Sequence, residues 1–447
     1  MATMPHAYPQ DLAAFLCGRW DDPAACLDAP EAVAGGVSEP LPDTPALATL
    51  LSVCYQASLL REEERPVRFR LILRAPEQFP ATEGPPTGFH RLVFTAPRPC
   101  TEHELRRLSP AVEFYRSLIG VQLDPEQGLQ IWGLVHSGPR WLQAVHGGRD
   151  SFQALPPALV VRVTAPGRIA VCKGLVTLAT LNGGRLVCPA LDVFDSRWLP
   201  ESFAATRAEL WALHAAARER ASQPWAPLDA QFVRIVAQHM VRRMLSLVRN
   251  AHHGGTLLYL PPDRAAECCG QNPYLTLKYT FADEEPRQRI RTLTVRLMNA
   301  LAEAYGPHEF GEQTVGWNEY MTNHHPTGTH LDEAIFEMVH LIAGLFAVDG
   351  AVVLTKRFEL LGFGGEISGA LDQVSVVARA LDAEGEQTEP EFTDGVGTRH
   401  RSVYRLCQAV HDIIAVVISQ DGNVRFVKWK DGLVTYWDQV ATSLLDI

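Results

Sequence analysis

The sequence lacks a surplus of basic residues. Its 447 residues include 40 lysines and arginines against 51 aspartates and glutamates, which gives a formal net charge of −11. A general nucleic-acid binder needs a basic surplus to neutralise a phosphate backbone, so the composition argues against nucleic acid as a partner. A local basic pocket for a nucleotide remains compatible with this charge.

Long apolar runs and metal-type cysteine pairs are also missing. No uninterrupted apolar run is long enough to cross a bilayer, and the N-terminal residues lack the basic and apolar regions of a signal peptide. The nine cysteines include no C-x-x-C pair of the kind that binds zinc. We therefore expect a cytoplasmic protein with reduced thiols and no membrane partner. With 47% hydrophobic and 20% charged residues, the chain should form about two or three globular domains.

A glycine-containing loop runs into a basic helix start near the C-terminus. Residues 394–405 read DGVGTRHRSVYR, and apolar residues then recur at helical spacing. Thr398 is a candidate N-cap. Arg399, His400 and Arg401 stand on the first turn, where free N–H groups and the helix dipole favour an anion. Because arginine forks match phosphate oxygens, this pattern predicts a polyphosphate site. A solvated basic helix start is the alternative.

A second candidate lies about fifty residues upstream. Residues 348–354 predict an apolar strand, and its start carries Asp349 followed by the small residues Gly350 and Ala351. An acid at a strand edge, with no side chain beside it, can hold a divalent metal against a ligand.

Together, these two stretches resemble the signature motifs of the diadenylate cyclase domain. The matching residues are Asp349-Gly350-Ala351 and the GTRHR run at 397–401. This family, which includes the DNA-integrity-scanning cyclases, condenses two ATP into cyclic di-AMP. The resemblance covers roughly residues 229–447. The rest of the chain, taken as a whole, resembles the DACNV-type sensor-like regions that are fused ahead of such cyclases in bacteria.

The resemblance implies a diadenylate cyclase, a nucleotidyltransferase that an N-terminal sensor domain regulates through an unknown effector. It implies that Asp349 holds Mg²⁺ or Mn²⁺ and orients the attacking 3′-hydroxyl, and that Asp349, Arg399 and His400 are catalytic. Cyclic di-AMP is two-fold symmetric, so two ATP sites should face each other in a homodimer or higher homo-oligomer. The expected nucleotide-binding residues are Gly350, Ala351, Gly365, Gly397, Thr398, Arg399, His400, Arg401 and Ser419.

One position departs from the family pattern. The turn after the last buried strand reads Ser419-Gln420-Asp421, where the family commonly carries Ser-Glu. Gln420 is neutral and Asp421 lies one residue further along. This difference leaves a second possibility open, a catalytically weak or inactive module of the same fold that senses ATP or a cyclic nucleotide.

Hydrophobic periodicity predicts an α/β (α+β) protein. We expect a loosely ordered segment over residues 1–45 and an α+β sensor domain over residues 46–222. A cyclase-like domain with a mixed sheet flanked by helices should follow over residues 223–447. The boundary falls at the proline-rich residues 223–228, after a helix. Residues 263–285 read as an insertion that carries one strand.

Arginines on a strand near the N-terminus are a weaker candidate site. Arg68 and Arg70 share one side of the strand predicted over residues 66–73, and Arg74 lies nearby. They could receive an anionic effector, although a solvated sheet face is the more common explanation of such a pattern.

A third group suits a metal-dependent hydrolase. Glu333, Glu337 and His340 are spaced four and three residues apart, so they share one face of a predicted helix. The order differs from the His-Glu-x-x-His motif of metalloproteases, and a charged solvent face is the more common explanation of the pattern.

Overall fold

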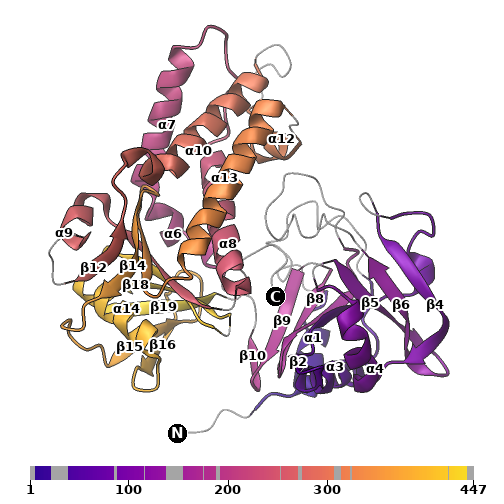
Figure 1. Ribbon diagram of the computed structural model, residues 1–447. Coiled ribbons are helices and arrows are strands. Elements are labelled where there is room, and N and C mark those ends of the chain that lie inside the picture. The colour runs from indigo at the N-terminus through magenta and orange to yellow at the C-terminus, as the bar shows by residue number, and fades with distance from the viewer. Residues whose placement is uncertain are drawn as a thin grey trace. The chain divides into compact units, whose positions relative to one another are not determined.

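The computed structural model divides into two compact units, which we describe separately (Figure 1). Unit 1 comprises residues 1–189 with 444–447, and unit 2 comprises residues 190–443. No helix in the described part of the chain is long and apolar enough to span a membrane. The structure describes residues 6–21, 39–84, 88–114, 116–136, 155–174, 176–187, 192–251, 253–269, 274–306, 314–322, 325–420 and 422–439.

Unit 1 is an α+β domain built on a mixed sheet. Eight of its described strands form a sheet in the order β10-β9-β8-β7-β3-β5-β6-β4, in which β3 and β5 pair in parallel, and β1 and β2 form a separate two-stranded sheet. Helices α1, α3 and α4 contribute to a core on one face of this sheet. The helices are α1 (Pro9–Cys17), α3 (Thr44–Leu59) and α4 (Glu102–Leu108). The strands are β1 (Arg61–Glu62), β2 (Arg65–Pro66), β3 (Phe69–Leu73), β4 (His90–Pro99), β5 (Ser117–Asp124), β6 (Gly128–His136), β7 (Leu159–Ala165), β8 (Arg168–Lys173), β9 (Val176–Asn182) and β10 (Arg185–Val187).

The basic strand of unit 1 is buried rather than solvated. β3 lies in the middle of the sheet, and Arg70 exposes only 2% of its surface. The Arg74 side chain pairs with Glu39 at 3.0 Å, and the Arg68 guanidinium lies over the Phe114 ring at 5.1 Å from its centre. Arg68 and Arg70 do share one side, since both guanidiniums lie over Phe114, but the expected solvated face is wrong because Arg70 is buried and the other two arginines are half-buried.

Unit 2 contains a mixed sheet flanked by helices, as predicted. Its described strands form a nine-stranded sheet in the order β12-β14-β13-β11-β17-β18-β19-β15-β16, with β11–β13 and β15–β19 parallel. The strands are β11 (Gly255–Leu260), β12 (Leu275–Thr280), β13 (Ala351–Thr355), β14 (Leu360–Ile367), β15 (Val376–Ala380), β16 (Thr388–Phe392), β17 (Ile414–Ile418), β18 (Val424–Lys430) and β19 (Leu433–Gln439). The helices are α6 (Trp198–Glu201), α7 (Ala204–Glu219), α8 (Phe232–Asn250), α9 (Ala265–Cys269), α10 (Glu284–Ala304), α12 (Trp317–Thr322), α13 (Pro326–Leu345) and α14 (Thr398–Ala409).

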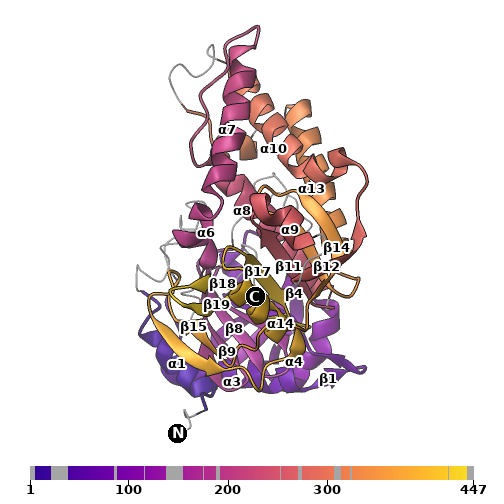
Figure 2. The same cartoon turned by 90° about the vertical axis from the view of Figure 1, so that its left-hand side faces the viewer.

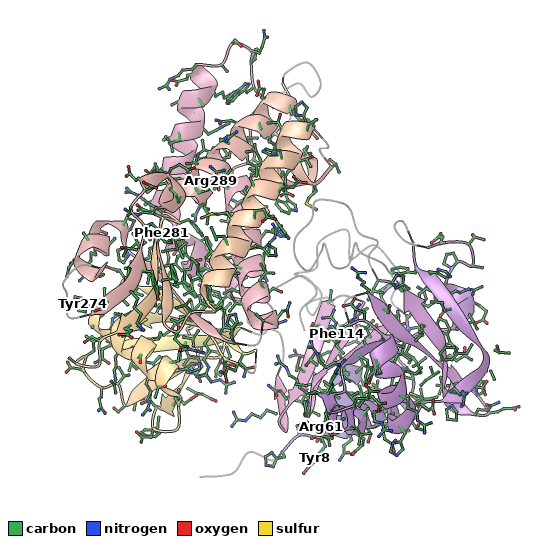
Figure 3. All side chains as sticks on the ribbon, in the orientation of Figure 1. Tyr8, Arg61, Phe114, Tyr274, Phe281 and Arg289 are labelled. Carbon is green, nitrogen blue, oxygen red and sulfur yellow. The ribbon has the colours of Figure 1, made fainter. Side chains whose placement is uncertain are left out.

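Two separate cores cover the two faces of this sheet. Along β11, Leu257 and Tyr259 point to the core formed with α8, α10 and α13, whereas Leu258 and Leu260 point to the core formed with α14. Figure 1 and Figure 2 show α14 on one side of the strands and the long helices on the other. Phe281, which is labelled in Figure 3, follows β12 and packs against the first core.

The helix that precedes the proline-rich break belongs to unit 2. Leu210 of α7 lies in the same core as α8 and α10, and Nδ1 of His214 lies 2.7 Å from Oδ1 of Asn299 on α10. Within the break itself, the Ala226 N–H donates to the Ala302 carbonyl at 2.9 Å. The division at residues 189 and 190 therefore differs from the predicted boundary at residue 222. The prolines mark a turn that packs inside the unit.

Candidate functional site

One edge of the unit 2 sheet brings together strand ends from distant parts of the chain. β11 and β13 run in parallel, with Thr256 opposite Ala351. Antiparallel pairing places Gly255 opposite Ile418 at the end of β17, and Ala351 opposite Gly365 near the end of β14. Neighbouring strands lie about 4.8 Å apart, and β11 lies between β13 and β17. The start of β13 and the end of β17 are therefore separated by roughly 10 Å.

The predicted acidic motif lies at this edge. Asp349 immediately precedes β13 and its side chain is exposed. Gly350 has a φ of +121°, and a β-carbon there would come within 2.6 Å of the Gly364 carbonyl carbon. Glycine is required here because the two backbones approach each other so closely. Packing between β13 and β14 thus accounts for this glycine, and its predicted closeness to a ribose stays a prediction.

The predicted phosphate motif begins at the same edge. Nη1 of Arg399 contacts the Ile418 carbonyl oxygen at 3.5 Å. A β-carbon on Gly254, just before β11, would come within 2.7 Å of the same nitrogen. The predicted capping role of Thr398 is wrong, because Thr398 is the first helical residue and Gly397 is the N-cap. Since Gly397 has no side chain to accept them, the N–H groups of the first turn lack a side-chain cap.

His400 lies among charged groups behind this helix start. Burial, together with the nearby Arg425 and Arg399 guanidiniums, lowers the pKa of His400 to about 4, and Asp438 opposes this shift. The imidazole is therefore neutral at pH 7. A neutral imidazole can donate a hydrogen bond to a phosphate oxygen, but it adds no positive charge.

Arg425 is part of a hydrogen-bonded group that the sequence analysis missed. Its Nε donates to Oδ1 of Asp438 at 2.7 Å, and its Nη1 donates to the Tyr404 hydroxyl at 3.2 Å. The guanidinium also lies over the Tyr436 ring, 4.4 Å from its centre. This group connects β18 and β19 to α14 and borders His400. The register of the hairpin formed by β18 and β19 places Arg425 opposite Asp438, which is the signal that could have revealed this pair.

A second missed group lies beside Asp349. Nζ of Lys278 on β12 pairs with Glu366 on β14 at 2.7 Å. A hydrogen bond and the charge of Glu366 raise the pKa of Lys278, and Asp349 adds to the shift. The strand predicted within residues 263–285 is confirmed as β12, and it pairs antiparallel with β14 as part of the main sheet. Lys278 is thus a cation near the predicted metal ligand.

Two further predicted residues, Arg401 and Ser419, lie near this edge. Arg401 is half-buried on the first turn of α14, and Ser419 closes the turn after β17, where its hydroxyl accepts the Asn423 N–H at 3.0 Å. Gln420 is exposed, and Asp421 lies outside the described residues. In the described ranges, Asp349 makes no ion pair or hydrogen bond with the basic residues of α14, so its carboxylate is available.

The donor set at this edge fits a metal ion that arrives with a nucleotide. The part of the chain that the structure describes contains no group of three or more His, Cys, Asp or Glu side chains placed to hold a metal. Mg²⁺, however, is commonly bound by one or two carboxylates together with substrate phosphates. Asp349 offers one such carboxylate, and the uncapped helix start and Arg399 offer a place for the phosphates.

The hydrolase hypothesis fails on geometry. Glu333 and Glu337 are exposed on α13, and Nδ1 of His340 lies 3.2 Å from the Phe336 carbonyl oxygen. Among the described residues these side chains do not form a metal-binding group. The charged solvent face is the correct interpretation of this pattern.

Comparison with known protein families identifies the first unit. Residues 37–136 match the family described as the probable sensor domain DACNV, and this stretch lies within unit 1. The match confirms a sensor domain in this part of the chain and associates the protein with the regulation of diadenylate cyclases. No curated protein matches the chain.

Proposed function

We propose that the protein is a diadenylate cyclase, which condenses two ATP into cyclic di-AMP and two pyrophosphates under the control of unit 1. The position of Asp349 and Arg399 at the same sheet edge supports this proposal, because their motifs lie far apart in the sequence and the pairing of β11 with β13 and β17 brings them to this edge. The DACNV match in unit 1 supports it.

The start of α14 would bind the phosphates. The uncapped N–H groups after Gly397 and the guanidiniums of Arg399 and Arg401 would hold the β and γ phosphates. Neutral His400 would donate one further hydrogen bond. Holding these phosphates stabilises the charge that develops as pyrophosphate leaves, which is the main protein contribution to phosphoryl transfer.

The acidic motif would act on the attacking group. Asp349 would accept a hydrogen bond from the ribose 3′-hydroxyl and orient it. The 3′-oxygen of each ATP forms a bond to the α-phosphorus of the other, the bond to pyrophosphate breaks, and the hydroxyl proton passes to solvent. Mg²⁺ or Mn²⁺ held by Asp349 would, when bound, neutralise the triphosphate charge. Two subunits must face each other because each supplies one ATP.

The test is direct. Purified protein incubated with ATP and Mg²⁺ or Mn²⁺ should yield cyclic di-AMP on chromatography, and the rate per subunit should rise with protein concentration. Asp349→Asn should abolish turnover while circular dichroism stays unchanged. Glu333→Gln removes a charge from an exposed position on α13 and is the matched control, which should retain turnover. Product formation by Asp349→Asn at the unaltered rate would contradict the site.

A second candidate is a nucleotide-sensing module without turnover. The exposed, neutral Gln420 at the end of β17 favours it, because the family commonly places an acid at this turn. Tight ATP binding without any product, at all protein concentrations and with both metals, would support this candidate. If the Gln420→Glu variant then formed cyclic di-AMP, the missing acid at position 420 would explain the lack of turnover.

A further inference from the structure

A pocket in unit 2 lies away from the proposed nucleotide site. It is lined by Tyr259 near the end of β11 and by Ile414 at the start of β17, whereas the nucleotide edge is formed by the start of β11 and the end of β17. Gly255 and Tyr259 are thus separated by roughly 13 Å along β11. The pocket also belongs to the opposite face of the sheet from α14, since Tyr259 points to the α8 side.

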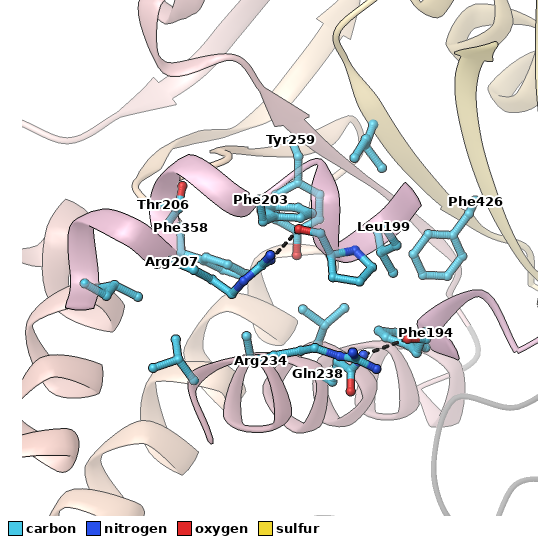
Figure 4. Close-up of a pocket in the computed structure, with 16 residues that line it drawn as sticks. Phe194, Leu199, Phe203, Thr206, Arg207, Arg234, Gln238, Tyr259, Phe358 and Phe426 are labelled. Atoms are coloured by element: carbon cyan, nitrogen blue, oxygen red, sulfur yellow. Dashed lines mark hydrogen bonds between the residues drawn. The ribbon is translucent and has the colours of Figure 1, made fainter. Parts of the chain in front are cut away.

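Aromatic and aliphatic side chains form most of this pocket. Phe194, Phe203, Phe358 and Phe426 contribute rings to its walls (Figure 4). The volume of the pocket that is open to the centre of a water molecule is about 70 Å³. A single water needs roughly 10–15 Å³ by this measure, so the pocket has room for a small organic molecule.

Tyr259 places a hydroxyl in this apolar setting. Its side chain is 2% exposed, and its oxygen has no hydrogen-bond partner among the described residues. Buried polar groups are almost always paired in native proteins, so an unpaired hydroxyl in a pocket wall calls for a partner. Burial raises the pKa of Tyr259, which keeps the hydroxyl protonated and able to donate.

Two arginines line the same pocket from different helices. Arg207 comes from α7 and Arg234 from α8, and Figure 4 shows them on opposite sides of the pocket. Burial lowers the pKa of Arg207, and the nearby Arg234 charge lowers it further. Nη1 of Arg234 donates to Oε1 of Gln231 at 3.4 Å, whereas its Nε is buried and has no partner in the part of the chain that the structure describes. Across the described ranges, neither arginine pairs with a carboxylate, so two like charges here lack a counter-charge.

We propose that this pocket binds a small amphipathic carboxylate, with its anionic head toward Arg207, Arg234 and the Tyr259 hydroxyl. A short aliphatic or aromatic body fits between the phenylalanine rings. The carboxylate neutralises the two guanidiniums and accepts the unused tyrosine donor, whereas a cationic ligand of the same size adds to the repulsion. This site is independent of the proposed cyclase activity and is tested without it.

Calorimetry on the full-length protein tests the proposal with hexanoate and phenylacetate as probes. Hexanol and hexylamine are the neutral and cationic controls. Both carboxylates should bind, hexanol should bind at least tenfold more weakly than hexanoate, and hexylamine should not bind. Equal binding of hexanol and hexanoate would overturn the role of the arginines. No binding of either carboxylate would overturn the site.

Variants locate the binding within the pocket. Arg234→Gln should weaken hexanoate binding at least tenfold and Tyr259→Phe about two- to tenfold. Arg296→Gln removes the same charge from an exposed position on α10 and should leave the affinity unchanged. Ala237→Phe fills the pocket and should abolish binding, with thermal unfolding as the check on folding. Unchanged affinity in a folded Ala237→Phe variant would place the ligand elsewhere and overturn the proposal.

Discussion

Gly254 and Arg399 lie so close that a β-carbon on the glycine would come within 2.7 Å of the arginine Nη1. The same β-carbon would come within 2.7 Å of the Ile418 carbonyl oxygen. Three segments therefore pack closely against one another: the turn before β11, the end of β17 and the first turn of α14. A guanidinium that is held in this way is pre-positioned for an anion.

Gly254→Ala should displace Arg399 and strain the backbone, because Gly254 has a φ of +65°. We expect a loss of about 1–3 kcal/mol in unfolding free energy and weaker ATP binding, measured by urea unfolding and calorimetry. Gly344→Ala on α13 is the control. Nothing lies within 4 Å of its added β-carbon, so this change should leave ATP binding intact and stability equal or higher. If Gly254→Ala and Gly344→Ala had the same unfolding free energy and the same ATP affinity, close packing around Gly254 would not explain either property.

Arg399→Ala should weaken ATP binding by about 1.5–3 kcal/mol, the usual contribution of a charge-assisted hydrogen bond. Calorimetric titration with ATP measures the effect. Arg405→Ala removes the same charge from a later turn of α14 and should change the affinity much less. If both variants lost affinity equally, general attraction between charges would explain binding, and the phosphate site at the helix start would be wrong.

ATP binding should take up protons at about pH 5–6. Free His400 is neutral there because its pKa is about 4, and a triphosphate beside the imidazole raises that pKa. Calorimetry in two buffers with different ionisation heats measures the uptake. His400→Gln should abolish it, and an unchanged uptake in this variant would place the phosphates away from His400.

The same pKa predicts how stability depends on pH. The folded pKa of His400, about 4, lies below the ordinary value of 6.5. Between these values the unfolded chain binds more protons, so the unfolding free energy should fall as the pH drops from about 6.5 to about 4. Burial lowers the pKa of His239 to about 3, which adds to this acid sensitivity. Urea unfolding at several pH values should show a shallower slope for His400→Gln than for the unaltered protein.

Asp438→Asn should destabilise the protein by about 1–3 kcal/mol, because it leaves the Arg425 guanidinium without its carboxylate. Arg379, 3.6 Å from the same carboxylate, would lose its partner as well. Asp431→Asn is the control on the same hairpin, since the Asp431 side chain is 82% exposed and its ion pair should contribute little. Equal urea midpoints for the two variants would show that the Arg425 group does not support the fold.

Truncation should distinguish the two candidate boundaries. A fragment that starts at residue 190 keeps α6 and α7, whereas one that starts at residue 223 loses buried Phe194 and Leu210. Each of these side chains contributes about 1.5–3 kcal/mol, so the shorter fragment should melt at a lower temperature or fail to fold. Equal melting temperatures would favour the boundary expected from the prolines. If unit 1 regulates assembly, the longer fragment and the full chain should also differ in oligomeric state or basal rate.

Local patterns predicted the parts of the fold that depend on neighbouring residues. The last buried strand, expected directly before the turn at Ser419, is β17, which is buried along its whole length. The sequence predicts that Gly350 lies close to a ligand. The structure shows that it lies close to the backbone of Gly364. A residue type that excludes a side chain does not reveal which neighbour requires the space. The misplaced cap at Thr398 is an error of one residue, which is common at helix ends.

The groups around the site could not be read from local patterns. Lys278 lies near Asp349 only because β12 joins the sheet beside β14, and Arg425 bonds to Tyr404 only because α14 packs on β18. Such neighbours are set by the pairing of strands and helices that are distant in sequence. The C-terminal hairpin is the exception, because its register places Asp438 opposite Arg425.

The pairing of β11 with both β13 and β17 also determines when the proposed site can form during synthesis. Gly255 finds its partner only when Ile418 has been made. At about 5–20 residues per second, a ribosome needs roughly 10–30 s to travel between these positions. During this interval β11 can pair with β13 on one side, but its other side lacks the β17 partner. We therefore expect unit 1 to fold first and unit 2 to depend most on chaperones, with premature termination before β17 leaving an aggregation-prone chain.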